Sequence, residues 1–205
     1  MTAIKICGLT SVEDARRCVA LGVEALGVNL VPSSPRVIDR ATARAIVEAV
    51  GDRALVVAVV ADLPVAEMLS LRADTGVGCL QLHGAEPPDA LTPLLPHAYK
   101  ALRVGDPSDV AAIARYPGEH VLVDAKVPGV LGGSGHVFDW ALVVDVARAR
   151  KLTLAGGLNA GNVGRAIEIV RPFAVDIASG VELPGAPRKK DEARLAELVR
   201  AVRAA

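Results

Sequence analysis

Eight short apolar runs recur along the chain, and a stretch with the spacing of an amphipathic helix follows each of them. Most of these runs are continuously apolar rather than alternating, which is typical of strands in a parallel sheet that is covered on both faces. The predicted strands span residues 4–8, 25–30, 54–61, 78–83, 98–104, 120–124, 152–155 and 174–177. Eight consecutive strand–helix units predict an α/β fold, a closed (β/α)8 TIM barrel.

The segments between the strands carry apolar residues at three- and four-residue spacing, as amphipathic helices do. The first predicted helix begins at Thr10, where Glu13 three residues on would complete a capping box. Residues that share an apolar face include Val12, Ala15 and Val19 in the first helix, Val65, Met68 and Leu69 in the third, and Leu195, Leu198, Val199 and Val202 in the last. We expect these faces to pack against the outside of the barrel.

The length favours one compact domain over residues 1–205, since a domain usually takes roughly 100–200 residues. The chain is 52% hydrophobic but only 2% aromatic, so Val, Leu, Ile and Ala must fill the core. A doubly wound open sheet is the structural alternative, and it would bind a dinucleotide at a Gly-x-Gly-x-x-Gly motif after the first strand. The sequence has no such motif there.

The charge balance excludes several classes of partner. Lys+Arg and Asp+Glu both total 23, so no basic excess indicates a nucleic acid or an anionic membrane surface. No apolar run reaches the roughly 18 residues of a membrane span, and the N-terminus lacks the pattern of a signal peptide. We therefore predict a cytoplasmic protein whose partner is a small molecule, not a nucleic acid or a membrane.

The chain has three cysteines, Cys7, Cys18 and Cys79. An odd number at wide spacing fits neither a disulfide framework nor a Cys-x-x-Cys site, which predicts reduced thiols. Cys18 lies in the first helical pattern and Cys79 near the start of a strand, and we expect both to pack as small buried hydrophobes.

Cys7 and Asp124 are the candidate acid–base pair. Each ends a predicted strand, and the active sites of TIM barrels lie at the C-terminal ends of the strands. At neutral pH an ordinary carboxyl is ionised and an ordinary thiol is protonated, the opposite of what a general acid and a general base require. The site should therefore raise the pKa of the carboxyl and lower the pKa of the thiol. The alternatives are core packing for Cys7, and a helix cap or an ion pair with Lys126 for Asp124.

The glycines after the last two strands indicate a phosphate site. Gly156 and Gly157 follow the seventh strand, and Ser179 and Gly180 follow the eighth, where barrels often bind phosphate through bare backbone N–H groups. Simple tight turns are the alternative explanation. The glycine-rich stretch 132–135, in the loop 129–135, is read equally well as a lid or as a ligand contact.

Arg36 and His83 are further candidates for contact with substrate. Arg36 lies beside Pro35, which restricts the backbone, and its planar guanidinium suits a carboxylate or a phosphate. A solvated surface arginine is the alternative, and His83 could equally satisfy a turn. The other three histidines share no ligand spacing, so we predict no metal site.

Several of these residues belong to short motifs that follow one another in order from the first strand to the last. The motifs are KICGLT at 5–10, SPR at 34–36, QLHG at 81–84, VDA at 123–125, GGSG at 132–135, FDW at 138–140, AGGL at 155–158 and DIASGVE at 176–182. As a set they resemble the phosphoribosylanthranilate isomerase family of tryptophan biosynthesis.

The resemblance implies an Amadori rearrangement of N-(5-phosphoribosyl)anthranilate without a metal or organic cofactor. Both a monomer and a homodimer are compatible with the sequence. It implies Asp124 as the general acid and Cys7 as the general base. Arg36 would bind the anthranilate end and Asp176 a sugar hydroxyl. The backbone around Gly156, Gly157, Ser179 and Gly180 would hold the phosphate.

Two segments depart from the family pattern. The stretch 27–32 is less aromatic than usual, and the stretch 185–191 after the last motif is longer and more basic. Two other functions stay open at this point: another phosphosugar isomerase of the histidine-pathway type, in which two aspartates would form the acid–base pair, and a phosphosugar-binding barrel without catalysis.

Overall fold

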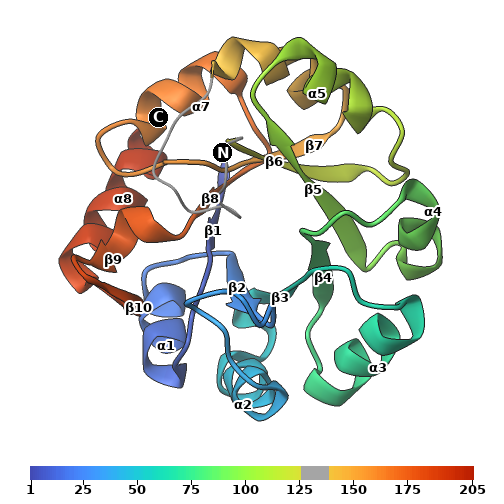
Figure 1. The fold of residues 1–205 in the computed structure, drawn as a ribbon. Coiled ribbons are helices and arrows are strands. Elements are labelled where there is room, and N and C mark those ends of the chain that lie inside the picture. The colour runs from blue at the N-terminus through green and yellow to red at the C-terminus, as the bar shows by residue number, and fades with distance from the viewer. Residues whose placement is uncertain (126–138) are drawn as a thin grey trace.

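Eight parallel strands close into a barrel in the order of the sequence, which confirms the predicted TIM barrel (Figure 1). The structure is a computed structural model, and it describes residues 1–125 and 139–205. The barrel strands are β1 (Ala3–Ile6), β2 (Ala25–Asn29), β3 (Leu55–Val60), β4 (Cys79–Leu82), β5 (Ala98–Val104), β6 (His120–Ala125), β7 (Lys151–Leu154) and β8 (Ala174–Ile177). The predicted bounds of the fifth and eighth strands are confirmed, and the other predicted ends lie within two residues of the observed ones.

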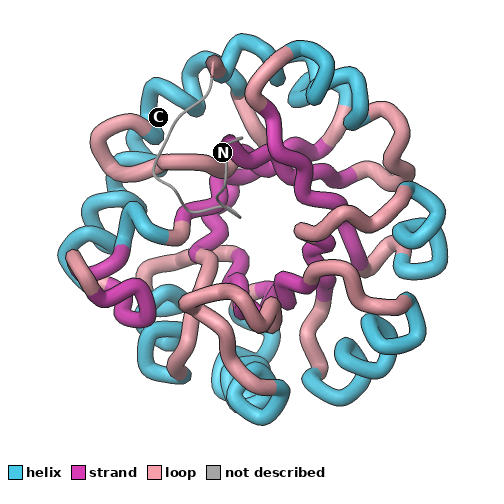
Figure 2. The backbone as a smooth tube through the Cα atoms, in the orientation of Figure 1, coloured by secondary structure: helices cyan, strands magenta, loops and turns pink. Residues whose placement is uncertain are grey.

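Helices form a ring around the barrel (Figure 2). The α-helices of the described residues are α1 (Val12–Ala20), α2 (Arg40–Val50), α3 (Val65–Thr75), α4 (Pro88–Leu91), α5 (Pro107–Ile113), α6 (Val144–Ala149), α7 (Val163–Val170) and α8 (Glu192–Ala204). Short 3-10 turns are η1 (Gly51–Arg53), η2 (Thr92–Leu94), η3 (Trp140–Val143) and η4 (Ser179–Val181).

The predicted start of the first helix is wrong by one residue. Ser11, not Thr10, is the N-cap, and its side chain accepts a hydrogen bond from the backbone N–H of Asp14. Thr10 instead donates its hydroxyl hydrogen to the carbonyl of Arg188, 2.7 Å away. That contact ties the β1–α1 loop to a segment 178 residues later, which no local pattern reveals.

A small antiparallel hairpin that the sequence did not predict follows η4. It consists of β9 (Glu182–Leu183) and β10 (Ala186–Lys190), and it contains the long basic stretch near the C-terminus. Its strands are short and carry Pro187 and three cations, so they lack the apolar signature of the barrel strands.

The core has two parts. Most buried apolar residues lie between the sheet and the helices, where Cys18 is fully buried as predicted. A second, smaller cluster fills the barrel interior and includes Cys79, also buried as predicted, with Tyr99. Leu69 was expected on a buried helix face, but 45% of its surface is exposed.

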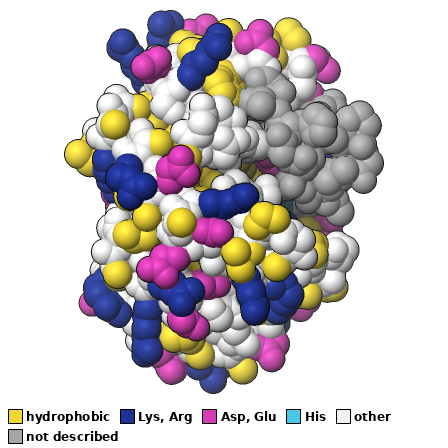
Figure 3. Space-filling view, turned by 90° about the vertical axis from the view of Figure 1, so that its left-hand side faces the viewer, with side chains coloured by type: hydrophobic (Ala, Val, Ile, Leu, Met, Phe, Trp, Pro, Cys, Tyr) yellow, Lys and Arg dark blue, Asp and Glu magenta, His cyan; other side chains and the backbone are white. Residues whose placement is uncertain are grey.

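Charged side chains of both signs are interspersed over the face seen in Figure 3, in keeping with the balanced composition. In the described part of the chain, none of the helices combines the length and the apolar character that a membrane span requires.

Candidate active site

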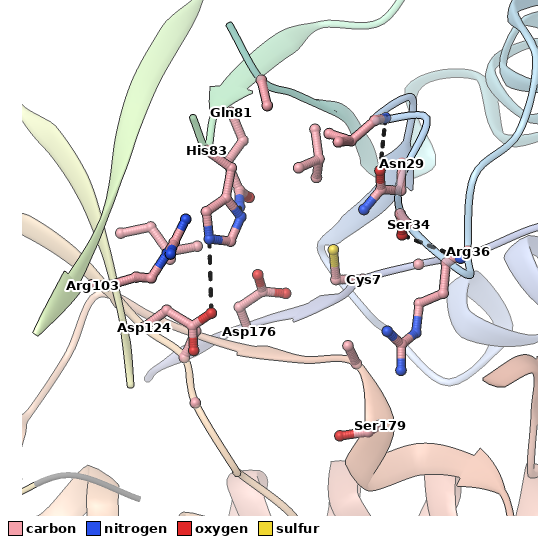
Figure 4. A pocket seen from close by; sticks show the side chains of 18 of the residues that line it. Cys7, Asn29, Ser34, Arg36, Gln81, His83, Arg103, Asp124, Asp176 and Ser179 are labelled. Atoms are coloured by element: carbon pink, nitrogen blue, oxygen red, sulfur yellow. Dashed lines mark hydrogen bonds and ion pairs between the residues drawn. The ribbon is translucent and has the colours of Figure 1, made fainter. Parts of the chain in front are cut away.

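The C-terminal mouth of the barrel opens into a cavity of about 900 Å³ (Figure 4). This volume is within the usual range of roughly 300–1,000 Å³ for small-molecule sites. Eight of the nine predicted site residues line it: Cys7, Arg36, His83, Asp124, Gly156, Gly157, Asp176 and Ser179. The ninth, Gly180, is not one of the lining residues. The stretch 132–135 and Lys126 fall outside the described residues.

Cys7 follows β1 directly, two residues after Lys5, and its backbone N–H donates to the carbonyl of Ile177 over 2.8 Å. Gly27 on β2 makes room for the thiol, because a Cβ there would lie 2.7 Å from Cys7 Sγ. Burial raises the pKa of Cys7, while the positive charges of Lys5 and Lys190 act to lower it. The net direction is opposite to the predicted lowering, because burial outweighs the two ammonium groups.

Lys5 is buried in the barrel interior and was missed from the sequence. Its Nζ donates to Asp176 Oδ2 over 2.7 Å and to Gln81 Oε1 over 3.0 Å. Lys5 and Asp176 are register partners on the adjacent strands β1 and β8, so their side chains point to the same face. Side chains two residues apart on a strand point to the same face, so a Cys7 that faces the barrel mouth places Lys5 inside the barrel. The sequence therefore held a signal for Lys5.

Asp124 is buried at the end of β6, and Figure 4 shows Asp176 between it and Cys7. Burial raises the pKa of Asp124 to about 6, and Asp176 adds to the shift. A 2.8 Å hydrogen bond from the N–H of Ala125 to Asp124 Oδ1 opposes it. This direction agrees with the one expected for an acid at this position. The nearest polar atom of His83, Nε2, lies 3.8 Å from Asp124 Oδ2.

Arg36 is not a solvated surface residue. Its Nε and Nη2 donate to the two carboxylate oxygens of Glu182 over 2.6 and 2.7 Å. The side chain crosses directly over Gly8, where φ is +75° and an added Cβ would overlap Arg36 Cδ. Glycine at position 8 is thus needed both for the backbone conformation and for the arginine's path.

Lys190 joins this pair from β10. Its buried ammonium donates to Glu182 Oε1 over 2.9 Å, to the Cys7 carbonyl over 2.7 Å and to the Ala178 carbonyl over 3.1 Å. The sequence left the three cations at 188–190 without a role, because nothing in a basic run shows which member folds inward. The network Arg36–Glu182–Lys190 fixes both the arginine and the backbone of the candidate base.

Replacing Glu182 by glutamine should therefore lower the free energy of unfolding by about 3 kcal/mol, because the variant leaves the buried cations Lys190 and Arg36 uncompensated. Urea denaturation measures the change. The matched control is Glu119→Gln, which breaks an exposed 3.0 Å pair with Lys151 and should cost less than about 1 kcal/mol. Equal losses in the two variants would contradict the role given to Glu182.

Glycine is required near the predicted phosphate site for two reasons, backbone conformation and close packing. Gly156 and Gly157 have φ of +92° and +65°, a region that L side chains rarely adopt. A Cβ on Gly180 would overlap the carbonyl oxygen of Leu158, so this glycine lets the β8 loop pack against the β7 loop. Gly156, Gly157 and Ser179 border the cavity, whereas Gly180 is not one of its lining residues.

Within the described ranges 1–125 and 139–205, no group of three or more His, Cys, Asp and Glu side chains is placed to hold a metal ion. Cys7, Asp124 and Asp176 line one cavity, an arrangement suited to proton transfer on a bound small molecule.

Residues 4–201 match the profile of a protein family described as N-(5'-phosphoribosyl)anthranilate (PRA) isomerase. The chain belongs to this family. A phosphoribosylanthranilate isomerase of Acidithiobacillus ferrooxidans is 40% identical over 205 residues, which cover 99% of this chain and 98% of the relative.

Solved structures of phosphoribosylanthranilate isomerases share the whole fold. The enzyme from Thermotoga maritima superposes with a TM-score of 0.91 at 34% identity, with all of both chains covered. A second structure of the family, in complex with reduced 1-(o-carboxyphenylamino)-1-deoxyribulose 5-phosphate, gives a TM-score of 0.87 at 31% identity, again over all of both chains.

Proposed function

We propose that this chain is a phosphoribosylanthranilate isomerase that converts N-(5'-phosphoribosyl)anthranilate to 1-(o-carboxyphenylamino)-1-deoxyribulose 5-phosphate in tryptophan biosynthesis, with Asp124 as general acid and Cys7 as general base. The observation that carries the proposal is one cavity, in a chain of this family, that holds a carboxyl with a raised pKa and a thiol at two strand ends.

The first step opens the furanose ring. Asp124 gives its proton to the ring oxygen as the bond between that oxygen and C1′ breaks, and the lone pair of the anthranilate nitrogen forms the C=N bond of a protonated Schiff base. A pKa of about 6 keeps a fraction of Asp124 protonated near neutral pH, where an ordinary aspartate would be almost fully ionised.

The second step removes the proton from C2′. Cys7 takes it as a thiolate, the C–H electrons form the C1′=C2′ bond, and the positive Schiff base becomes a neutral enolamine that tautomerises to the ketone. Lys5 and Lys190 are the two cations whose charge favours the thiolate, although burial holds the pKa of Cys7 above its ordinary value. The Cys7 thiolate is therefore a strong base, but only a small fraction of the protein carries it at neutral pH.

The remaining lining residues supply the binding contacts. Arg36 has Nη1 left for the anthranilate carboxylate, since its hydrogen bonds to Glu182 use Nε and Nη2. Asp176 Oδ1 is buried without a hydrogen-bond partner among the described residues, which suits a sugar hydroxyl donor. Backbone N–H groups near Gly156, Gly157 and Ser179 would hold the phosphate.

An assay with two substrates tests the proposal. We expect turnover of N-(5'-phosphoribosyl)anthranilate and little or none of the histidine-pathway phosphosugar, because a thiol rather than a second aspartate follows β1. Product formation is followed chromatographically with purified protein. Turnover of the histidine-pathway compound alone would replace the proposal by that activity, and binding of both compounds without turnover of either would favour the non-catalytic barrel.

A further inference from the structure

Gln81 connects the barrel interior to the candidate acid. Its side chain is buried on β4, where Oε1 accepts hydrogen bonds from Lys5 Nζ over 3.0 Å and from the hydroxyl of Tyr99 over 3.1 Å. On its other side, Gln81 Nε2 lies 3.3 Å from Nδ1 of His83. Lys5 is itself held by Asp176 Oδ2 at 2.7 Å, so its place is fixed independently of Gln81.

This arrangement determines which way round the amide lies. The ammonium of Lys5 can only donate, so the atom of Gln81 that faces it must be the oxygen. The amide –NH₂ then faces His83 and can only donate to Nδ1. A nitrogen that accepts a hydrogen bond carries no proton, so in a neutral ring the proton lies on Nε2.

The surroundings of His83 keep the ring neutral. Burial lowers the pKa of His83 to about 4, and nearby positive charges contribute to the shift. The charged groups that act on the ring are Arg103, Lys100 and Lys5, which lower its pKa, and Glu86, which opposes them. At neutral pH the ring therefore holds a single proton, on the nitrogen that Gln81 leaves free.

That nitrogen faces the candidate acid. Nε2 is buried and has no hydrogen-bond partner among the described residues, and it lies 3.8 Å from Asp124 Oδ2, beyond hydrogen-bond distance (Figure 4). Both groups line the cavity. Within the described site this N–H makes no hydrogen bond, so it can donate to an oxygen atom that comes within hydrogen-bond distance.

We propose that Gln81 is a positioning residue for the reaction: it fixes His83 as the neutral ring protonated on Nε2, and thereby keeps the acidic proton of Asp124 free to point toward the substrate. The inference rests on the proposed role of Asp124 as the general acid. In the opposite tautomer, the lone pair of Nε2 would face Asp124 and could accept a hydrogen bond from its carboxyl, which would turn the acidic proton toward the ring and away from the substrate. With Nε2 already protonated, the ring can only donate, and it supports the carboxylate that forms after Asp124 has given up its proton.

Nitrogen NMR of uniformly ¹⁵N-labelled protein without ligand tests the tautomer directly. At pH 7, the two-bond couplings from the ring C–H protons should show a protonated Nε2 and an unprotonated Nδ1 for His83. The chain has four histidines, and His83→Gln identifies the signals of this ring by their loss. A protonated Nδ1, or an even mixture of both tautomers, in the unsubstituted protein would overturn the proposal.

Gln81→Glu tests the role of the amide. A carboxylate oxygen opposite Nδ1 can only accept a hydrogen bond, so the proton of the neutral ring should move to Nδ1. Nε2 would then be an acceptor that faces Asp124, and kcat should fall about 10-fold or more. Tyr99→Phe is the matched control, because Lys5 still orients Gln81, and the tautomer should not change. If Gln81→Glu does not fold, Gln81→Met removes the donor at similar volume and should produce a mixture of tautomers.

An unprotonated Nδ1 in folded Gln81→Glu, or a single unchanged tautomer in Gln81→Met, would rule out control by Gln81. Because the tautomer is read without substrate, a protein that fails to isomerise N-(5'-phosphoribosyl)anthranilate can still show the expected ring state. Failure of the proposed function and failure of this inference are therefore separate outcomes.

Discussion

Asp124→Asn should lower kcat by about 10²- to 10⁴-fold, the usual contribution of a general acid, while the barrel stays folded. The amide has nearly the same shape as the carboxyl, and its oxygen can still accept the hydrogen bond from the N–H of Ala125. What it lacks is a proton acidic enough to be transferred to the ring oxygen. Steady-state kinetics measure the loss, and circular dichroism checks the fold.

The pH dependence gives this prediction a second measurement. The pKa of Asp124 in the free protein is raised to about 6, and the acid acts in its protonated form. Its contribution to kcat/KM is therefore full below that pH and falls about tenfold per unit above it. The descending limb attributable to Asp124 should disappear in Asp124→Asn. Wild-type turnover in the variant would remove Asp124 as the acid.

Cys7→Ala should reduce kcat by a similar factor, about 10²- to 10⁴-fold, because no other described side chain at the end of β1 can take the C2′ proton. Full activity in this variant would show that the base lies elsewhere. Steady-state kinetics with the same substrate measure the effect, and thermal unfolding shows whether the small change of volume at the barrel mouth affects stability.

Alkylation by iodoacetamide tests the same thiol in the unsubstituted chain. Cys7 lines the cavity, whereas Cys18 and Cys79 are buried and have pKa values raised to about 12 and about 11. These two thiols are internal controls, since thiolate character and access govern the reaction. Peptide mass mapping should show that activity is lost in step with modification of Cys7, and that a bound product analogue slows both.

The barrel could be predicted because its signals are local. Continuous apolar strands and amphipathic helices repeat eight times, and each repeat reads correctly without knowledge of the others. The errors occur where distant contacts decide the structure. Ser11 rather than Thr10 is the N-cap of α1, because Thr10 donates a hydrogen bond to the Arg188 carbonyl. The hairpin β9–β10 has no apolar pattern from which it could be predicted.

The candidate site divides in the same way. Cys7 and Asp124 could be placed because every strand of a parallel barrel ends at the same mouth. Their partners could not, since Lys5 meets Asp176 across 171 residues, Arg36 meets Glu182 across 146, and Lys190 meets the Cys7 carbonyl across 183. The raised pKa of Cys7 is a further case, because it depends on how much of the thiol the folded chain removes from water.

The candidate base lies at the seam where the first and last strands of the barrel meet. The Cys7 N–H is bonded to the Ile177 carbonyl, and the Cys7 carbonyl to Lys190. During synthesis from the N-terminus, the thiol is made among the first residues, but its hydrogen-bond partners are among the last. A ribosome-bound chain that ends before residue 190 lacks the second of these contacts, so we expect the candidate site to be complete only after the final strand and the hairpin have docked.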